Sequence, residues 1–271
     1  MTLARFFQAH SQVIHVCLAR VRGSSPREAG AEMFVAENAL HGTIGGGQLE
    51  YMAIDKARAM LRAGRTSEHM DVPLGPEIGQ CCGGRVDITL ALMHAADRTN
   101  ALADAAAEQA AMPHIYVLGA GHVGRALATL FQAMPVRCIL IDNRVEELSL
   151  CDAQVEKRLT ALPEADIRNA PTGSAFIVLT HDHALDFLLT AEALARGDAA
   201  YVGLIGSATK RVKFERFCKT DAPEVRTGDL ICPIGANGSS DKRPEIIAAF
   251  IVAEVMARLT NHARQRVEIH K

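Results

Sequence analysis

The clearest structural pattern in this chain lies in the segment His114-Ile115-Tyr116-Val117-Leu118-Gly119-Ala120-Gly121-His122-Val123-Gly124-Arg125-Ala126. Its apolar, β-branched start predicts a strand over 114–118, and a helix is predicted after the glycines, through Phe131. A second strand is predicted over 136–141 and is followed at once by Asp142. Strand, G-x-G-x-x-G, helix and an acidic residue about 20 positions later form the context of a dinucleotide-binding fingerprint. We therefore predict a Rossmann-like α/β domain with a parallel sheet.

The ligand of this fingerprint is a separate question, because a fold does not determine a ligand. The three glycines of the fingerprint are candidate cofactor-binding residues: Gly119, Gly121 and Gly124. Asp142 would bond a ribose 2′-hydroxyl if NAD(H) bound, whereas Arg144 nearby leaves a phosphorylated ribose as an alternative. His122 replaces the usual small or apolar residue beside the phosphate, which favours some other anionic ligand.

Further strands are predicted over 175–179 and 200–204, and both end in polar or glycine-bearing loops. In such sheets the ligand crevice lies outside the carboxyl ends of the strands. His181 and His183, after the first of these strands, could serve as acid/base groups or metal ligands, or cap the next helix. Ser207 and Lys210, after the second strand, could grip a phosphate or begin a helix.

A strongly apolar helix is predicted over 245–259, with Pro244 at its first turn. One face carries apolar residues at helical spacing: Ile246, Ala249, Phe250, Ala253 and Met256. Three more widen this stripe: Ile247, Ile251 and Val255. That breadth predicts burial on more than one side, with a homodimer contact as one explanation.

The length of 271 residues suits two domains. We predict an N-terminal domain over 1–96, a helical connector over the Ala-rich stretch 97–112, and the Rossmann-like domain over 113–271. Pro113 ends the connector, and a new hydrophobic pattern begins there. In the first domain, strands are predicted over 13–21, 32–36 and 85–93, so we expect a small mixed α+β domain.

A glycine-rich turn in the first domain is predicted to lead into a helix. The run Gly42-Thr43-Ile44-Gly45-Gly46-Gly47-Gln48-Leu49-Glu50 is followed by apolar residues at helical spacing. The free N–H groups and the positive dipole end of such a helix make a natural anion site. The alternative is a tight strand-to-helix turn that binds nothing.

Two adjacent cysteines lie in the run Gly79-Gln80-Cys81-Cys82-Gly83-Gly84, between a stretch that we expect to be irregular and the strand over 85–93. Adjacent cysteines rarely bridge each other, because the disulfide would strain the backbone. Cys81 and Cys82 on a loop of glycines suit sulfur chemistry or a soft metal. The alternative is a pair of small apolar residues at a strand entrance.

Composition and charge exclude several classes of function. The net charge is −2 and the basic residues are spread out, so we expect neither nucleic acid nor an anionic membrane as partner. No apolar stretch is long enough to span a bilayer, and the first ten residues do not resemble a signal peptide. Seven cysteines at irregular spacing indicate reduced thiols and a cytoplasmic protein.

The order of motifs along the whole chain resembles the XdhC/CoxI family, the xanthine dehydrogenase accessory proteins. The motifs are G-S-S-P-R at 23–27, G-T-I-G-G-G-Q-L-E at 42–50, G-Q-C-C-G-G at 79–84, V-L-G-A-G-H-V-G-R-A at 117–126, C-P-I-G at 232–235 and K-R-P-E at 242–245. The sequence 236–240 departs from the family pattern. The resemblance implies a small N-terminal domain joined to a Rossmann-like domain, usually as a dimer.

The resemblance also implies an accessory factor without turnover of its own. Such a chaperone binds the molybdenum cofactor, molybdopterin, and protects it while a cysteine desulfurase replaces an oxo ligand with sulfur. It then passes the cofactor to the molybdenum subunit of xanthine dehydrogenase. The residues suit this role: Gly45, Gly46 and Gly47 could meet the phosphate, and Cys81 or Cys82 could contact molybdenum or accept sulfur. Three polar residues are candidate partners of the pterin edge: Arg27, Gln48 and Glu50.

Two other classes of function stay open. An NAD(P)-dependent oxidoreductase would use His181 or His122 as proton donor and Asp142 on the ribose, but it leaves the cysteine loop without a role. A purely structural assembly partner would use the C-terminal helix as its contact. Within the first hypothesis, the Rossmann-like domain could bind a second nucleotide, the cofactor itself or nothing.

Overall fold

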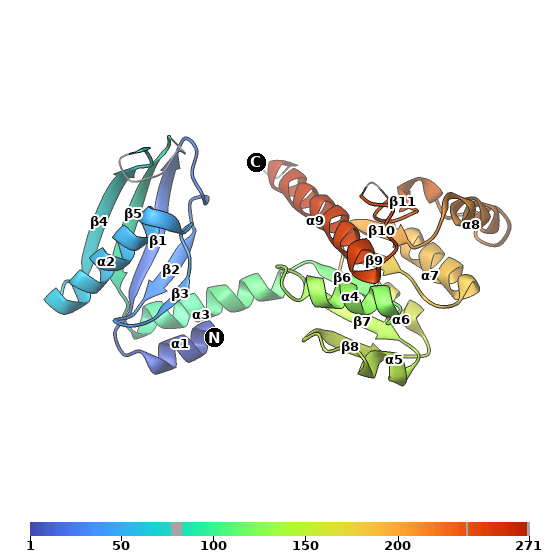
Figure 1. Ribbon diagram of the computed structural model, residues 1–271, viewed down its shortest axis with the longest axis horizontal. Coiled ribbons are helices and arrows are strands. Elements are labelled where there is room, and N and C mark those ends of the chain that lie inside the picture. Colours follow the sequence, from blue (N-terminus) through green and yellow to red (C-terminus); the bar gives the residue numbers. More distant parts are fainter. Residues whose placement is uncertain (77–82, 237, 270–271) are drawn as a thin grey trace. The chain divides into compact units, whose positions relative to one another are not determined.

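The computed structural model describes residues 1–76, 83–236 and 238–269. Within these residues the chain forms two compact units, residues 1–110 and 111–271 (Figure 1). Each unit has its own sheet, so each is described separately. The first sheet is antiparallel and the second is parallel, which confirms the predicted combination of a mixed α+β unit with a Rossmann-like unit.

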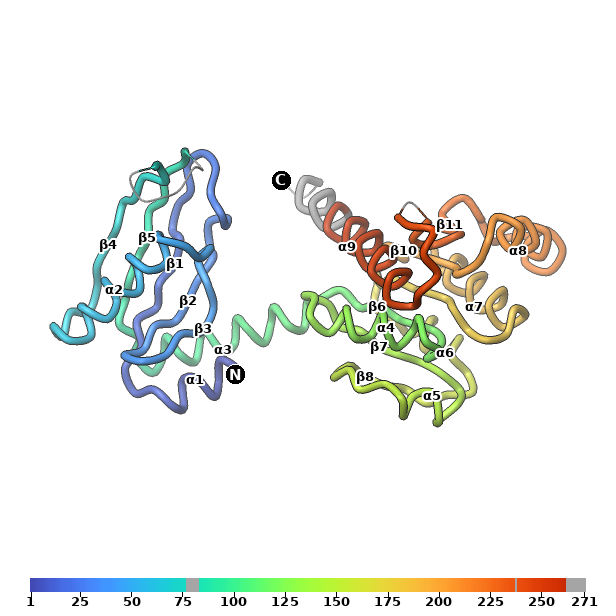
Figure 2. Tube along the Cα trace, in the orientation of Figure 1, coloured from blue at the N-terminus to red at the C-terminus, as the bar shows by residue number. Residues whose placement is uncertain are grey.

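The first unit is a five-stranded antiparallel sheet with three helices. In chain order its elements are α1 (Leu3–Ala9), β1 (Ile14–Arg22), β2 (Glu32–Val35), β3 (Leu40–Gly42), α2 (Gly47–Ala63), β4 (Ser67–Pro73), β5 (Arg85–Leu92) and α3 (Ala95–Ala110). The strand order is β3-β2-β1-β5-β4, and it can be followed along the trace in Figure 2. The long strands β1 and β5 pair in the middle, with a register shift between Leu18 and Arg20.

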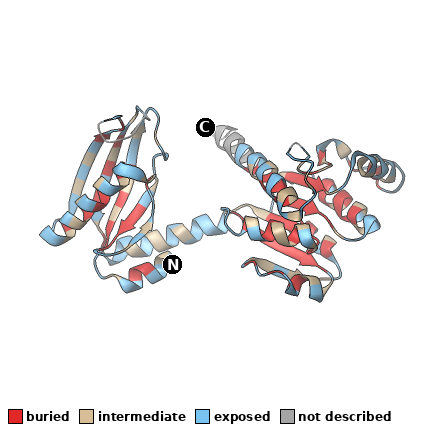
Figure 3. Ribbon diagram, in the orientation of Figure 1, coloured by how far each residue is buried: buried red, intermediate tan, exposed pale blue. Residues whose placement is uncertain are grey.

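Helix α2 packs on one face of this sheet because its apolar residues recur at helical spacing. Its buried residues are Leu49, Ala53, Ile54, Ala57 and Met60. They meet the side chains that β1 and β5 turn to the same face, including Ile14, Leu18 and Ile88. Figure 3 shows this alternation of buried and exposed positions along the strands. A smaller cluster around Phe6, which also includes Phe34, joins α1 to the sheet.

The stretch before the cysteine loop, predicted to be irregular, is the edge strand β4, so that prediction was wrong. β4 pairs along its whole length with β5. Of its seven residues only Val72 is buried, and the others include Ser67, Glu68 and Asp71. Its covered face carries Glu68, Met70 and Val72, so a charged residue interrupts the apolar alternation that would have marked a strand. Its strand conformation therefore comes from pairing with β5.

The second unit is a six-stranded parallel sheet covered on both faces. Its elements are β6 (His114–Leu118), α4 (His122–Phe131), β7 (Arg137–Asp142), α5 (Val145–Ser149), β8 (Glu156–Leu159), α6 (Pro163–Arg168), β9 (Ala175–Val178), α7 (His183–Ala195), β10 (Tyr201–Leu204), α8 (Ala208–Asp221), β11 (Leu230–Ile231) and α9 (Pro244–Ile269). The strand order is β11-β10-β9-β6-β7-β8, which is the doubly wound order of dinucleotide-binding sheets. The order reverses between β6 and β9, where ligands of such sheets bind.

Two hydrophobic cores lie on the two faces of this sheet. One contains Phe131 of α4 and Ile251 of α9, and the other contains Phe176 of β9, Leu189 of α7 and Phe214 of α8. All four residues of β9 and all four of β10 are buried. Central strands covered on both faces read as short apolar runs, which is why they were predictable from the sequence.

Helix α9 is buried along Ile251 and Val255, two of the residues that widen the predicted stripe, and not along the five residues first predicted to form it. Its buried residues are Ala248, Ile251, Val252, Val255 and Leu259, and the helix packs against α4. Ala249, Phe250 and Ala253 of the predicted stripe are exposed. Because apolar residues surround most of this helix, its periodicity does not select one face, and the contact with α4 selects it instead.

Among the described residues, no helix is both long and apolar enough to cross a membrane. They contain no cluster of three or more histidine, cysteine or acidic side chains that could hold a metal ion. Their cysteines are free thiols: Cys17, Cys138, Cys151, Cys218 and Cys232. Cys81 and Cys82 lie outside the described residues.

Candidate functional site

The three glycine motifs of the first unit, far apart in sequence, pack against one another. A Cβ atom built on Gly45 would lie 2.8 Å from Cβ of Pro26. A Cβ atom on Gly84 would lie 2.0 Å from the carbonyl oxygen of Ser24. The segments 23–27, 42–47 and 83–84 therefore meet at one end of the antiparallel sheet, and close backbone contact requires glycine at Gly45 and Gly84.

The triple glycine turn has a backbone that favours glycine at each of its three positions. The φ angles of Gly45, Gly46 and Gly47 are 125°, 74° and 66°. Residues other than glycine rarely adopt these φ angles. A Cβ atom on Gly46 would meet nothing within 4 Å, so the surface beside this turn is open to a ligand. The turn leads directly into α2, as the sequence predicted.

The Glu50 carboxylate already binds much of this turn. Its Oε2 accepts hydrogen bonds from the Thr43 hydroxyl at 2.5 Å, from Ile44 N–H at 3.0 Å and from Gly46 N–H at 3.1 Å. Partial burial raises the pKa of Glu50, but these hydrogen bonds outweigh it and hold the pKa below its usual range. Two N–H groups that an external anion could have used are thus taken by the chain itself. The first turn of α2 has no side-chain cap, so its N–H groups remain for a ligand.

The other predicted partners lie around the same turn. Arg27 and Gln48 are exposed. The hydroxyl oxygen of Ser25, two residues from Arg27, is buried and has no hydrogen-bond partner among the described residues. A buried hydroxyl is normally paired, so the Ser25 hydroxyl is an exception among the described residues. Gly83, from the third glycine motif, is held by a hydrogen bond from its N–H to the Leu74 carbonyl at 2.8 Å.

The glycines of the fingerprint in the second unit divide into packing and approach positions. A Cβ atom on Gly124 would lie 1.9 Å from the Gly119 carbonyl oxygen, and one on Gly119 would lie 2.4 Å from the Leu179 carbonyl oxygen. A Cβ atom on Gly121 would meet nothing within 4 Å. Gly119 thus corresponds to the turn glycine of such fingerprints and Gly124 to the helix-packing glycine. Gly121 corresponds to the glycine at which these fingerprints admit a phosphate. His122, exposed, begins α4 directly after Gly121.

Asp142, the predicted ribose ligand, is buried and fully hydrogen-bonded within the chain. Its Oδ2 accepts from Ala120 N–H at 2.7 Å and from Arg144 Nη2 at 2.9 Å, and its Oδ1 accepts from the N–H and Nε of Arg144 at 2.9 and 3.0 Å. Burial raises the pKa of Asp142, but these bonds outweigh it and lower the pKa below its usual range. A carboxylate has about four acceptor positions. A ribose hydroxyl would therefore have to displace Arg144.

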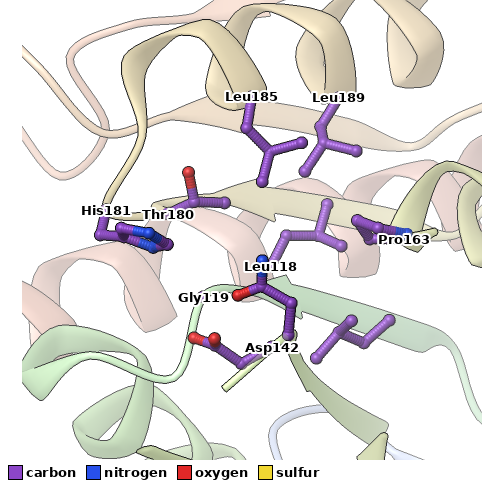
Figure 4. A pocket seen from close by; sticks show the side chains of 10 residues that line it. Leu118, Gly119, Asp142, Pro163, Thr180, His181, Leu185 and Leu189 are labelled. Carbon is purple, nitrogen blue, oxygen red and sulfur yellow. The ribbon is translucent and has the colours of Figure 1, made fainter. Parts of the chain in front are cut away.

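A small cavity lies beside Asp142 at the carboxyl ends of β6, β7 and β9. Figure 4 shows Gly119 and Asp142 on one side of it and Leu185 and Leu189 on the other. Its volume is about 20 Å³, which is the room needed by one water molecule. A nucleobase does not fit there unless the apolar side chains move.

A buried ion pair that sequence reasoning missed connects the ends of β9 and β10. Lys210 Nζ lies 2.5 Å from Oδ2 of Asp186, and the two side chains are 11% and 1% exposed. Oδ1 of Asp186 accepts from the N–H of Thr180 at 2.8 Å. The stem of Lys210 passes over Gly206, where a Cβ atom would lie 2.5 Å from Cδ of Lys210. Lys210, a predicted phosphate ligand, is instead held by Asp186, whose only sequence signal is an acid in the first turn of a helix.

The pH dependence of stability should reveal the Asp142 network. Because the pKa of Asp142 is lower when folded, its contribution is present above its unfolded pKa of about 3.9 and is lost as the pH falls through the folded value. We expect Asp142→Asn to cost about 2 kcal/mol at pH 7, and we expect this difference to shrink below about pH 4. Urea unfolding from pH 7 to pH 2.5 measures it. The exposed Asp152→Asn is the control, and an equally pH-dependent effect there would contradict this assignment.

Comparisons with known proteins agree with this architecture. Residues 115–255 match the XdhC Rossmann domain, and residues 7–72 match the XdhC and CoxI family. The chain is 25% identical over 248 residues to the uncharacterized protein YqeB of Escherichia coli strain K12, which covers 87% of this chain and 41% of that protein. The chain therefore spans about two fifths of the length of this relative. A crystal structure described as a xanthine dehydrogenase from Bacillus halodurans matches with a TM-score of 0.76 and 16% identity over 96% of both chains. At that identity the match shows a shared fold.

Proposed function

This chain belongs to the XdhC and CoxI family, and from that membership we propose that it binds the molybdenum cofactor, molybdopterin, during the maturation of xanthine dehydrogenase. In this proposal the protein protects the cofactor while a cysteine desulfurase exchanges an oxo ligand for sulfur. It then delivers the cofactor to the molybdenum subunit. The second unit supports the family assignment, and the first unit contains the proposed cofactor contacts.

The observation that carries the proposal is the meeting of the three glycine motifs in the first unit. They form a surface with few side chains, open beside Gly46 and Gly83, and the unpaired buried hydroxyl of Ser25 lies among them. A structural turn needs glycine where the backbone packs tightly, as at Gly84. The φ angles of Gly46 and Gly83, 74° and 67°, already favour glycine in a turn. What supports a ligand is the space left open there, close to a polar atom that has no partner among the described residues.

The chemistry of the described residues fits the groups of molybdopterin. When bound, the cofactor supplies molybdenum, a terminal phosphate and a pterin ring with a polar edge. The N–H groups of Gly47 and Gln48 would hold the phosphate, because the first turn of α2 lacks a side-chain cap. Arg27 and Gln48 would bind the pterin edge through their polar side chains. Cys81 and Cys82, which lie outside the described residues, are proposed to contact molybdenum.

Glu50 would both order the turn and limit where the phosphate binds. Its Oε2 accepts all the hydrogen bonds described for this carboxylate, which leaves Oε1 as an acceptor for N–H groups of the pterin. The same negative charge repels a phosphate from Ile44 and Gly46. The phosphate is thereby directed to the N–H groups at the start of α2.

Cofactor binding should depend on the two adjacent cysteines. We expect the reduced protein, titrated with molybdopterin without oxygen, to bind saturably, and we expect Cys81→Ser with Cys82→Ser to weaken binding at least tenfold, that is by at least about 1.4 kcal/mol. The hydroxyl of serine is a poor replacement for a thiolate on a soft metal. Cys17→Ser is the matched control, because burial raises the pKa of the Cys17 thiol and keeps it protonated.

Two results of this titration would count against the proposal. If the double variant bound molybdopterin like the unchanged protein, the cysteines would not be cofactor ligands. A parallel titration with NAD(H) and NADP(H) tests the alternative of an oxidoreductase. Saturable nicotinamide binding without molybdopterin binding, together with hydride transfer to a reducible substrate, would favour that alternative.

A further inference from the structure

A second cavity, larger than the one beside Asp142, lies at the carboxyl ends of β9 and β10. Its volume is about 450 Å³, which is within the range of pockets for small ligands. Thr180 follows β9, and Ile205 and Gly206 follow β10, so the two strand ends form its floor. This is the edge of a doubly wound sheet where ligands bind. The cavity lies in the second unit, apart from the proposed cofactor contacts of the first.

Basic side chains gather on the wall of this cavity. Three basic side chains line it, from α7 and α8: His183, Lys210 and Lys213. No aspartate or glutamate belongs to the part of the wall that the structure describes. Asp186 neutralises Lys210 from beneath and is itself 1% exposed. Lys213 is exposed and is not among the ion pairs of the described residues, so its ammonium group is available to a ligand.

The polar groups around Lys213 suit a phosphate better than a carboxylate. Ser207 and Thr209 add hydroxyl groups to the same wall. Lysine binds an anion as a compact point charge, and a phosphate offers it more acceptor oxygens than a carboxylate does. Hydroxyl and ammonium donors together satisfy the several acceptor oxygens of a phosphate.

Part of the lining is apolar and packs against the core. Phe187 and Ile205 form this part. The Phe187 ring packs edge-on against the ring of Phe214, which is fully buried, with the ring centres 5.5 Å apart. The Asp186–Lys210 pair links α7 to α8, and both helices contribute residues to the lining of the cavity. A rigid apolar face beside a phosphate site favours a ligand with a ring or an aliphatic body.

We propose that this cavity binds a phosphomonoester. Its phosphate lies beside Lys213 and Thr209, and its apolar body packs against Phe187. This inference does not depend on the proposed function, because none of its residues belongs to the first unit. The partly buried Phe187 side chain would select against free inorganic phosphate, which has no apolar body to pack there.

Phenyl phosphate is the probe for this site, titrated into the full chain and followed by calorimetry at constant ionic strength. We expect saturable binding, weaker binding of inorganic phosphate, and no binding of phenol. Lys213→Ala should weaken phenyl phosphate at least about tenfold, because one charge-assisted contact is lost. Lys219→Ala is the matched control: it removes an exposed lysine in the last turn of the same helix, outside the cavity.

Each other outcome would overturn the inference. Absence of saturation, or equal losses in Lys213→Ala and Lys219→Ala, would show that there is no specific phosphate site. Equal affinities for inorganic phosphate and phenyl phosphate would show that an apolar body contributes nothing to binding, which contradicts a phosphomonoester site. Because Lys213 is exposed, its replacement leaves the fold intact, and a lost signal reports on binding. A failed molybdopterin titration would not affect this result.

Discussion

Replacement of Gly124 by alanine should cost the second unit about 3 kcal/mol or more of its free energy of unfolding. The added Cβ atom would lie 1.9 Å from the carbonyl oxygen of Gly119, and backbone must move to relieve the overlap. Alanine also raises helix propensity at this position in α4, but by only about 1 kcal/mol. The overlap therefore outweighs the gain. Hydrogen exchange resolved by peptide would show faster exchange in β6 and α4, while β1 of the first unit stays unchanged.

Gly121→Ala is the matched control within the same motif. Gly121 has a φ of −61°, which alanine adopts without strain, and its Cβ atom would meet nothing within 4 Å. We expect a change in stability within about 0.5 kcal/mol. If Gly121→Ala destabilised the unit as much as Gly124→Ala, the division of the glycines into packing and approach positions would be wrong. If a phosphate binds at this turn, Gly121→Ala should weaken the binding of that phosphate.

Lys210→Met should be about as damaging, with an expected loss of about 3–5 kcal/mol. Methionine fills most of the volume of the lysine stem, so the loss comes mainly from the Asp186 carboxylate, which is left buried without its partner. The β9–α7 connection should loosen, because Asp186 also accepts the hydrogen bond from Thr180 N–H. Urea unfolding gives the size of the effect, and hydrogen exchange of β9 and β10 locates it.

A second substitution distinguishes charge from packing in this prediction. Asp186→Asn combined with Lys210→Met removes both charges, and the asparagine oxygen still accepts from Thr180. We expect the double variant to recover most of the stability lost by Lys210→Met alone. A double variant as unstable as the single one would show that the methionine packs poorly, rather than that a buried charge lacks its partner.

The fold of the second unit was predictable from the sequence because its signals are local. The strand 114–118, the glycine spacing and the helix that follows lie within 18 residues of one another, and the buried strands β9 and β10 are short apolar runs. Strand β4 was missed because its side chains are mostly exposed. The buried face of α9 was predicted only in part, through Ile251 and Val255. Apolar residues surround this helix, so packing against α4 decides which of them are covered.

The candidate site was predictable in part. Glycine spacing singled out the motifs at 42–50 and 117–126, and the family resemblance added the motif at 23–27. It did not indicate that Gly45 packs on Pro26 or that Gly84 packs on Ser24. Contacts of this kind join strands of one sheet through its pairing register, which a single sequence does not specify in advance.

Residue types, spacing and periodicity thus establish the two kinds of sheet, the dinucleotide-binding fingerprint and the resemblance to one family. The partners of the carboxylates come from tertiary structure. Asp142 binds Ala120 across 22 positions, and Asp186 binds Lys210 across 24. A carboxylate looks the same in sequence whether it awaits a ligand or is already paired. Only folding brings its partner to it, and burial then makes that pairing the stable state, because an unpaired buried charge is costly.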